Sequence, residues 1–285
     1  MLINFEQINN ILKSRNLIIE GCFHIGAHEC EEISFYNSIG IEKENIVWID
    51  AIPSKVIEAK NRGIPNVYNA VITDKDNEEI LFNVSNNVQS SSIFEFGTHS
   101  IEHPSVVYVD KFKTNSITID TFFEKNNIDY TKLNFWNFDI QGAELLALKG
   151  AVKSIKYAKA IYLEVNNKEL YKGCGLIDDI DIFLAKYNFK RVLTNITIHG
   201  WGDALYIIDN NFINNKYSWG EESYITFLDN NIMDAFGKGT YRIIDNHNII
   251  AYFGSRTHNI KFNDNFTEFI SIRQDDSCVI NGKVI

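Results

Sequence analysis

Acidic side chains occur in two apolar, strand-like runs in the middle of the chain. Asp139 ends the run 133–140 (LNFWNFDI), and Glu164 lies in the run 160–166 (AIYLEVN). If the two strands are neighbours, one carboxylate could take a proton from a hydroxyl group that the other orients. The structural alternative for Asp139 is that it caps the following helix, whose first turn Glu144 would stabilise. For Glu164 a structural role is an equal alternative.

A glycine and another acid form a second candidate site nearer the N-terminus. Gly26 falls near the end of the run 21–27, where it would let the backbone approach a ligand at the start of the next helix. Asp50 falls near the end of the run 45–51, 24 residues after Gly26. That spacing is close to the one at which an acid binds a nucleotide ribose. For Asp50 we favour the ribose role over the alternative of a helix cap. For Gly26 the alternative is an ordinary turn glycine, because the chain lacks the other glycines of a GxGxxG motif.

Histidines are paired at two places, but neither spacing predicts a metal site. His24 and His28 span the end of a strand, and His99 and His103 lie in a segment that reads as a loop. Residues four apart share a face only on a helix, and no HExxH motif occurs, so we expect no zinc site. His199 and Trp201 lie in the turn between the last two strand-like runs of this region. They are further candidates for substrate contact, although an aromatic residue in a turn can also be there for packing.

Apolar runs alternate with segments of helical period from about residue 21 to 209. This alternation predicts a parallel sheet covered by helices on both faces, closed by an antiparallel pair of strands around Gly200. From Tyr217 onward, short strand-like runs are separated by turns, which predicts a small all-β module. We therefore expect one domain over 1–209, with an N-terminal helix in 1–20, then a linker over 210–216 and the β module over 217–285.

The composition restricts the class of partner. The 285 residues carry a net charge of -10, which disfavours nucleic acid and an anionic membrane surface as main partners. The four cysteines form no CxxC pair, and neither a signal peptide nor an apolar run of membrane length is visible. We expect a cytoplasmic protein with reduced thiols.

Together, these segments resemble the FkbM family of S-adenosylmethionine-dependent methyltransferases over about residues 21–209. The resemblance rests on the order and spacing of FHIGAHECEE, IVWIDAIPS, the SNNVQSSS loop, SITIDTFF, FDIQGAELLALKGA, IYLEVNNKELYKG and GWGDALYI. The sequence departs from the pattern at His24, where many relatives of this fold have an acidic residue.

The resemblance implies a Rossmann-like class I methyltransferase fold with a mostly parallel seven-stranded sheet and an antiparallel final strand. It implies S-adenosylmethionine as the methyl donor and O-methylation of a sugar or polyketide-type hydroxyl, of which we expect a sugar, nucleotide sugar or glycan. Asp139 would lie beside the methyl group as the first catalytic candidate, with Glu164 as the second. The expected cofactor contacts are His24, Gly26, His28, Asp50, Ala51, Ser91 and Asp139.

Three alternatives stay open at this point. The β module, rich in Asn, Asp, Trp and Tyr, is expected to contact carbohydrate, but it would also serve as a dimerisation surface in a homo-oligomer or as a substrate lid. A nicotinamide-dependent oxidoreductase is a rival class, against which the missing GxGxxG motif counts. The other rival is a non-catalytic protein that binds a glycan or a partner on a degenerate methyltransferase sheet.

Overall fold

The computed structural model describes residues 2–15, 17–209, 212–228, 231–235, 237–245, 247–263 and 266–285. Residues 210 and 211 of the expected linker lie outside the described residues. The chain forms two compact units, the larger one made of Met1–Asn9 and Ile19–Ile207, the smaller one of Asn10–Ile18 and Ile208–Ile285. No helix in the described part of the chain is long and apolar enough to cross a membrane.

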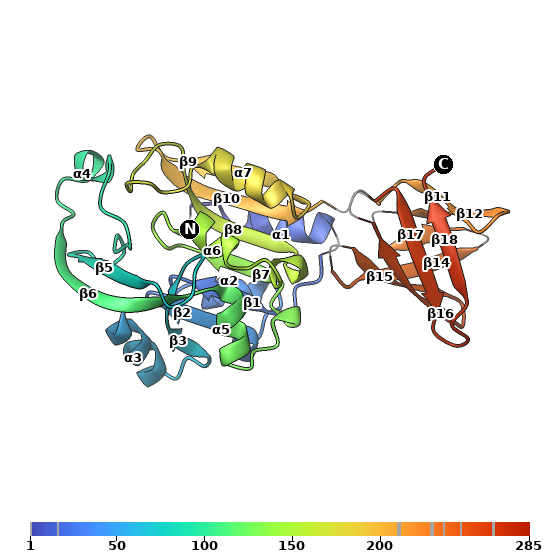
Figure 1. Ribbon diagram of the computed structural model, residues 1–285, viewed down its shortest axis with the longest axis horizontal. Coiled ribbons are helices and arrows are strands. Elements are labelled where there is room, and N and C mark those ends of the chain that lie inside the picture. The colour runs from blue at the N-terminus through green and yellow to red at the C-terminus, as the bar shows by residue number, and fades with distance from the viewer. Residues whose placement is uncertain are drawn as a thin grey trace. The chain divides into compact units, whose positions relative to one another are not determined.

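The larger unit is built on a seven-stranded sheet with the order β3-β2-β1-β7-β8-β10-β9 (Figure 1). Strand β1 pairs in parallel with β2 and β7, and β7 with β8, whereas β10 runs antiparallel to β8. The expected sheet, mostly parallel with an antiparallel final strand, is confirmed. The strands are β1 (Cys22–Ile25), β2 (Ile46–Asp50), β3 (Val67–Asn69), β7 (Phe135–Phe138), β8 (Ala160–Asn166), β9 (Phe189–Ile196) and β10 (Trp201–Ile208).

Helices cover both faces of this sheet. Successive residues of a strand point to opposite faces, and in β1 the His24 ring contacts Tyr36 of α2 while Phe23 packs against Phe123 of α5 with ring centroids 4.6 Å apart. Burial on both faces explains why the strands read as continuous apolar runs. The helices are α1 (Phe5–Ser14), α2 (Ile33–Ser38), α3 (Pro53–Asn61), α5 (Ile119–Lys125), α6 (Glu144–Lys149) and α7 (Ile177–Ala185).

A second, three-stranded sheet was not expected. Residues 66–72 are divided between two sheets: β3 joins the large sheet, while β4 (Val71–Ile72) joins β5 (Glu79–Ser85) and β6 (Tyr108–Ile117) in the order β4-β6-β5. Most of β6 escaped prediction, since its first residues are largely exposed and polar and show no apolar run. The short helix α4 (His99–Glu102) occupies a segment that was expected to be a loop.

The position of the site follows from the strand order. The chain runs outward from β1 through β2 to β3 and then resumes on the other side of β1 with β7, so β1 and β7 flank a switch point, where open α/β sheets bind ligands. We call residues 79–117 the arm. It is tied to this edge of the sheet, because the Gly97 N–H donates to the Leu170 carbonyl at 2.7 Å and the Ser92 hydroxyl to the Gln141 carbonyl at 2.8 Å.

The smaller unit is an antiparallel sheet of eight strands that follow one another in chain order. The last strand returns to the first, where Tyr217 and Val284 form a bridge and the Ile285 N–H donates to the Lys216 carbonyl at 2.9 Å. The expected small all-β module is confirmed, and it is a near-barrel. Its strands are β11 (Lys216–Trp219), β12 (Ser223–Phe227), β13 (Ile232–Asp234), β14 (Lys238–Ile243), β15 (Asn248–Phe253), β16 (Arg256–Phe262), β17 (Glu268–Arg273) and β18 (Val279–Lys283).

The interior of the near-barrel is aromatic, so most of the aromatic side chains behind the expected carbohydrate contact are buried, and the contact itself stays a prediction. Trp219, Tyr217 and Tyr241 are buried in it together with five phenylalanines. Burial of large aromatic rings is a main source of stability for so small a unit. Among the described residues of this unit, the large exposed aromatics are only Tyr224 and Tyr252.

Candidate functional site

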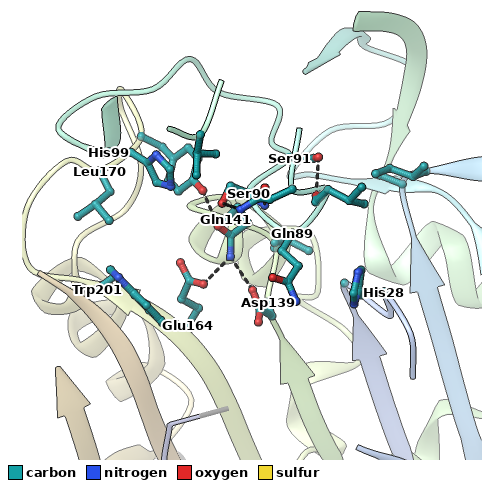
Figure 2. Close-up of a pocket in the computed structure, with 18 of the residues that line it drawn as sticks. His28, Gln89, Ser90, Ser91, His99, Asp139, Gln141, Glu164, Leu170 and Trp201 are labelled. Carbon is teal, nitrogen blue, oxygen red and sulfur yellow. Dashed lines mark hydrogen bonds between the residues drawn. The ribbon is translucent and has the colours of Figure 1, made fainter. Parts of the chain in front are cut away.

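A cavity of about 390 Å³ lies at the carboxyl ends of β1, β2, β7 and β8, with the arm on its other side. Figure 2 shows its two ends, with His28 at one and Trp201 at the other, and Asp139, Gln141 and Glu164 between them. All the lining residues belong to the larger unit. The cavity therefore combines three of the segments singled out in the sequence, those around Gly26, Asp50 and Asp139.

Asp50 closes one end of the cavity. Its two carboxylate oxygens accept the backbone N–H groups of His28 and Ile52, each at 2.8 Å. Burial raises its pKa, and these two hydrogen bonds oppose the rise. A carboxylate can accept about four hydrogen bonds, so Asp50 is held rigidly and keeps acceptor capacity for a ligand.

Gly26 is required at its position by a neighbouring strand. Its φ angle is +94°, and a Cβ atom added here would lie 1.9 Å from the carbonyl oxygen of Asp139. The Asp139 N–H in turn donates to the Ile25 carbonyl at 2.9 Å. The close approach that calls for glycine is thus between the ends of β1 and β7, although Gly26 also lines the cavity.

The amide of Gln141 joins the two central carboxylates. Its Nε2 donates to Asp139 Oδ1 at 2.7 Å and to Glu164 Oε2 at 2.5 Å, and its Oε1 accepts the hydroxyl of Tyr171. The register that pairs Phe138 with Leu163 places Asp139 beside Glu164. Both amide hydrogens and the amide oxygen are used, so the orientation of Gln141 is determined by three partners.

The carboxyl groups here differ in environment. Asp139 is exposed towards the cavity, whereas Glu164 is buried, and burial followed by the nearby Asp139 raises the pKa of Glu164 well above its usual range. Glu144 is also buried with a raised pKa, and its Oε1 accepts the backbone N–H groups of Ile140 at 2.9 Å and Gly142 at 3.3 Å. Glu144, and not the Asp139 side chain, stabilises the turn that leads into α6.

The first histidine of the sequence pattern does not line the cavity. His24 is 1% exposed, its Nδ1 lies 2.8 Å from the Tyr36 hydroxyl, and burial lowers its pKa to about 3. The acidic side chain on this side of the cavity is Glu32, which ends at 4.0 Å from His24 Nδ1 and whose pKa burial raises to about 7. Glu32 was missed because it lies beyond the strand end, at the start of α2.

The loop 85–92 forms part of the wall opposite the sheet. Ser91 is buried, and its hydroxyl accepts the Ser85 N–H at 3.0 Å and donates to the Val88 carbonyl at 2.5 Å. Val88, which lines the cavity, has a φ angle of +66°. A β-branched residue rarely adopts this conformation, and such strain is concentrated at functional loops.

The other end of the cavity is aromatic and apolar. His99 is 5% exposed and stacks on Phe96, with ring centroids 4.3 Å apart. Its Nδ1 has no hydrogen-bond partner among the described residues, and burial lowers its pKa to about 4. The remaining lining residues at this end include His103, Val106, Leu170 and Trp201. His199 does not line the cavity; its Nδ1 lies 2.8 Å from Glu102 Oε2.

The structure brings together seven of the eight predicted site residues and leaves out His24. The seven that line the cavity are Gly26, His28, Asp50, Ala51, Ser91, Asp139 and Glu164. Gln141 was quoted in the sequence pattern without a role; the signal that could have identified it is an amide placed two residues after a strand-end acid. In the described part of the chain, no cluster of three or more His, Cys, Asp or Glu side chains could hold a metal ion.

Residues 24–191, more than half of the chain, match the family model described as the Methyltransferase FkbM domain. No match was found among curated proteins. Among solved structures, magnesium protoporphyrin IX methyltransferase from Synechocystis PCC 6803 is similar at 10% identity and a TM-score of 0.36, over 72% of this chain and 78% of that one. A SAM-dependent methyltransferase from Aquifex aeolicus is similar at 12% identity and a TM-score of 0.34, over 73% of this chain and 91% of that one.

Proposed function

The chain belongs to the FkbM methyltransferase family and is an S-adenosylmethionine-dependent methyltransferase, and from this premise we propose that it methylates a hydroxyl group of a sugar, nucleotide sugar or glycan. The observation that carries the proposal is the exposed carboxylate of Asp139 in the middle of the cavity, held by Gln141 beside buried Glu164. An alcohol is a weak nucleophile, and a carboxylate that accepts its proton is the group that O-methylation needs.

The cavity fits S-adenosylmethionine chemically. Asp50, with its free acceptor capacity next to His28, would hold the ribose hydroxyls, and Gly26, Ala51 and Ser91 would line the same end. The acidic lining suits a cofactor that carries positive charge on its sulfonium and ammonium groups. Glu32 is the acid that supports the ammonium end, in place of the acidic residue that many relatives have at the position of His24.

The proposed mechanism divides the work among a few side chains. When bound, the cofactor would supply an electrophilic methyl group, and its demethylated thioether would be the leaving group. Asp139 receives the hydroxyl proton as the oxygen forms its new bond to carbon, and Gln141 keeps Asp139 oriented through Oδ1, which leaves the other oxygen for the proton. Burial and then the nearby Asp139 raise the pKa of Glu164, which disfavours a second negative charge at the centre. Much of the acceleration would come from alignment of the reacting atoms.

Two variants separate cofactor binding from catalysis. Asp139→Asn should lower kcat by roughly 100-fold or more, because it removes the base, while the Kd for S-adenosylmethionine changes little. Asp50→Ala should weaken cofactor binding, since the ribose hydroxyls lose their acceptor. Titration calorimetry with S-adenosylmethionine and its demethylated product measures the affinity, for which we expect a Kd of about 1 µM or roughly -8 kcal/mol.

Each outcome has a defined meaning. Unchanged turnover in Asp139→Asn would rule out Asp139 as the base and leave Glu164 as the candidate. If neither the cofactor nor its product binds the unmodified chain, the result would support the non-catalytic alternative. In that alternative the chain binds a glycan or a partner. The family membership removes the support for a nicotinamide-dependent oxidoreductase.

A further inference from the structure

Histidine apart, the ionisable side chains of Asp, Glu, Lys and Arg type that line the cavity are all acidic within the described residues. Six carboxyl side chains line it: Glu31, Glu32, Asp50, Asp139, Glu164 and Asp203. Within the described residues, the lining contains no lysine or arginine, and the nearby Lys168 is paired with Glu102 outside it. Proteins that bind phosphate groups use arginine, lysine or the N-terminus of a helix to do so.

His99 does not supply a positive charge to the cavity. His99, the buried histidine of the aromatic end, has a pKa lowered to about 4 and is neutral at physiological pH. Burial raises the pKa of Glu32, Glu164 and Asp203, which means that the charged forms of these carboxyl groups are poorly solvated. An anion bound beside them would further increase the free energy of their charged forms.

The aromatic end offers a different kind of recognition. Trp201 is partly exposed at the start of β10, and Leu170, Val106 and His99 complete an apolar wall near it, as Figure 2 shows for Trp201, Leu170 and His99. Aromatic faces pack against the C–H groups of a ring, and the central carboxyl groups accept hydrogen bonds from hydroxyls.

We propose that the acceptor is an uncharged hydroxyl compound, a free sugar or a glycoside, and that the acidic cavity rejects sugar phosphates and nucleotide sugars. The inference rests on the proposed function and narrows its acceptor class. The side chains that line the cavity are sufficient for this selectivity, without a further residue or ion.

The first test probes the charge at the cavity without an acceptor. Iodide and acrylamide quench the fluorescence of accessible tryptophan, and Trp201 is the candidate, since Trp48 and Trp136 are 0% exposed and Trp219 is 7% exposed. The Trp201 signal is the difference in fluorescence between the unmodified chain and Trp201→Phe. The ionic strength is kept at about 0.5 M, where charges more than several ångströms from Trp201 are screened. We expect a ratio of iodide to acrylamide quenching at least threefold below that of free N-acetyltryptophanamide. An equal ratio would overturn the inference.

A pair of matched variants controls for the overall negative charge. Val106 lines the cavity, whereas Val107 is 50% exposed and does not line it. Val106→Lys should at least double the iodide ratio at Trp201, and Val107→Lys, with the same change in net charge, should leave it unchanged. Equal responses of the two variants would show that the effect is not local to the cavity and would contradict the inference.

The second test uses matched acceptors at pH 8. Methyl transfer from radiolabelled S-adenosylmethionine is compared for each sugar as its methyl glycoside, its 1-phosphate and its nucleoside diphosphate derivative. The kcat/KM for the methyl glycoside should be at least tenfold above the kcat/KM for the two phosphorylated forms of the same sugar. Equal or faster labelling of a nucleotide sugar would overturn the inference. If no sugar is labelled, the quenching result still tests whether the cavity excludes anions, and calorimetry with the cofactor tests the proposed function separately.

Discussion

Two residues of the site show how a single side chain, or its absence, is determined by its surroundings. The carbonyl group of Asp139 leaves no room for a side chain at Gly26, whereas burial disfavours the charged form of Glu32. The first is a matter of steric contact between β1 and β7. The second is a matter of solvation next to a ligand cavity, where stability is commonly reduced in favour of function.

Gly26→Ala should destabilise the larger unit strongly. The new Cβ would meet the Asp139 carbonyl at 1.9 Å in addition to the cost of the positive φ angle, and we expect a loss of about 3 kcal/mol or more in the free energy of unfolding. Gly40 is the matched control, because it has a φ angle of +89° and nothing within 4 Å of an added Cβ. Gly40→Ala should cost only about 1 kcal/mol. Similar losses in urea titrations of the two variants would contradict the steric account.

Glu32→Gln should stabilise the protein in a pH-dependent way. The pKa of Glu32 is raised from about 4.5 to about 7 in the folded state, so the folded state binds the proton more tightly than the unfolded chain, and the stability of the unmodified protein falls as the pH rises through that interval. The variant lacks this loss, so it should gain almost nothing at pH 4 and up to about 3 kcal/mol at pH 8. Urea titrations at both pH values measure this, with Glu42→Gln, at an exposed position, as the control. A gain that is the same at both pH values would be inconsistent with the raised pKa.

At the scale of elements, the arm is the part that completes the cavity. Its own two strands are short of apolar contacts on their outer face, where Leu81 and Val109 are exposed. On its inner face, Phe96 packs against Tyr171 of the core. Specific bonds add to this attachment: the backbone bonds of Gly97 and Thr98 to residues 169 and 170, and the contacts of the Glu102 carboxylate with Lys168 and His199. Elements held by few buried contacts open most easily.

Glu102→Gln should loosen the arm without unfolding the core. The substitution removes the negative charge that holds Lys168 and His199, so hydrogen exchange at the Gly97 and Thr98 amides should accelerate while exchange in β1 and β7 stays slow. Glu95→Gln is a suitable control, since Glu95 pairs with Lys111 of the arm itself. If both variants gave the same exchange at Gly97 and Thr98, the arm would be held by its backbone bonds alone.

At the scale of the whole molecule, the two units have separate cores. Phe138 packs against Phe23 and Trp136 in the larger unit, and Phe227 packs among the aromatic rings of the near-barrel, with ring centroids 5.4 Å from those of Phe212. All the residues lining the cavity belong to the larger unit. A change in the core of one unit should therefore affect that unit.

Phe227→Ala should cost about 3 to 5 kcal/mol in the smaller unit, because it leaves a cavity among buried rings, while the Kd for S-adenosylmethionine stays the same. Phe138→Ala, at an equally buried position directly before Asp139, should weaken cofactor binding or abolish it. Calorimetric melting and cofactor titration of both variants measure this. Loss of cofactor binding in Phe227→Ala would mean that the smaller unit supports the site.

The sequence by itself determined the class of the larger unit, the all-β character of the smaller one and seven of the residues that line the cavity. Period and spacing are local properties, and acids at strand ends such as Asp50 and Asp139 are brought to one edge by any parallel sheet. The burial of His24 depended on which face of β1 meets α2, and the role of Gln141 on the register between β7 and β8. The polar strand β6 and helix α4 formed because they pack on partners distant in the chain, and the acidic sign of the cavity became visible only once Glu32, Glu164 and Asp203 lay around the same space. These are contacts between distant segments, which only the tertiary structure decides.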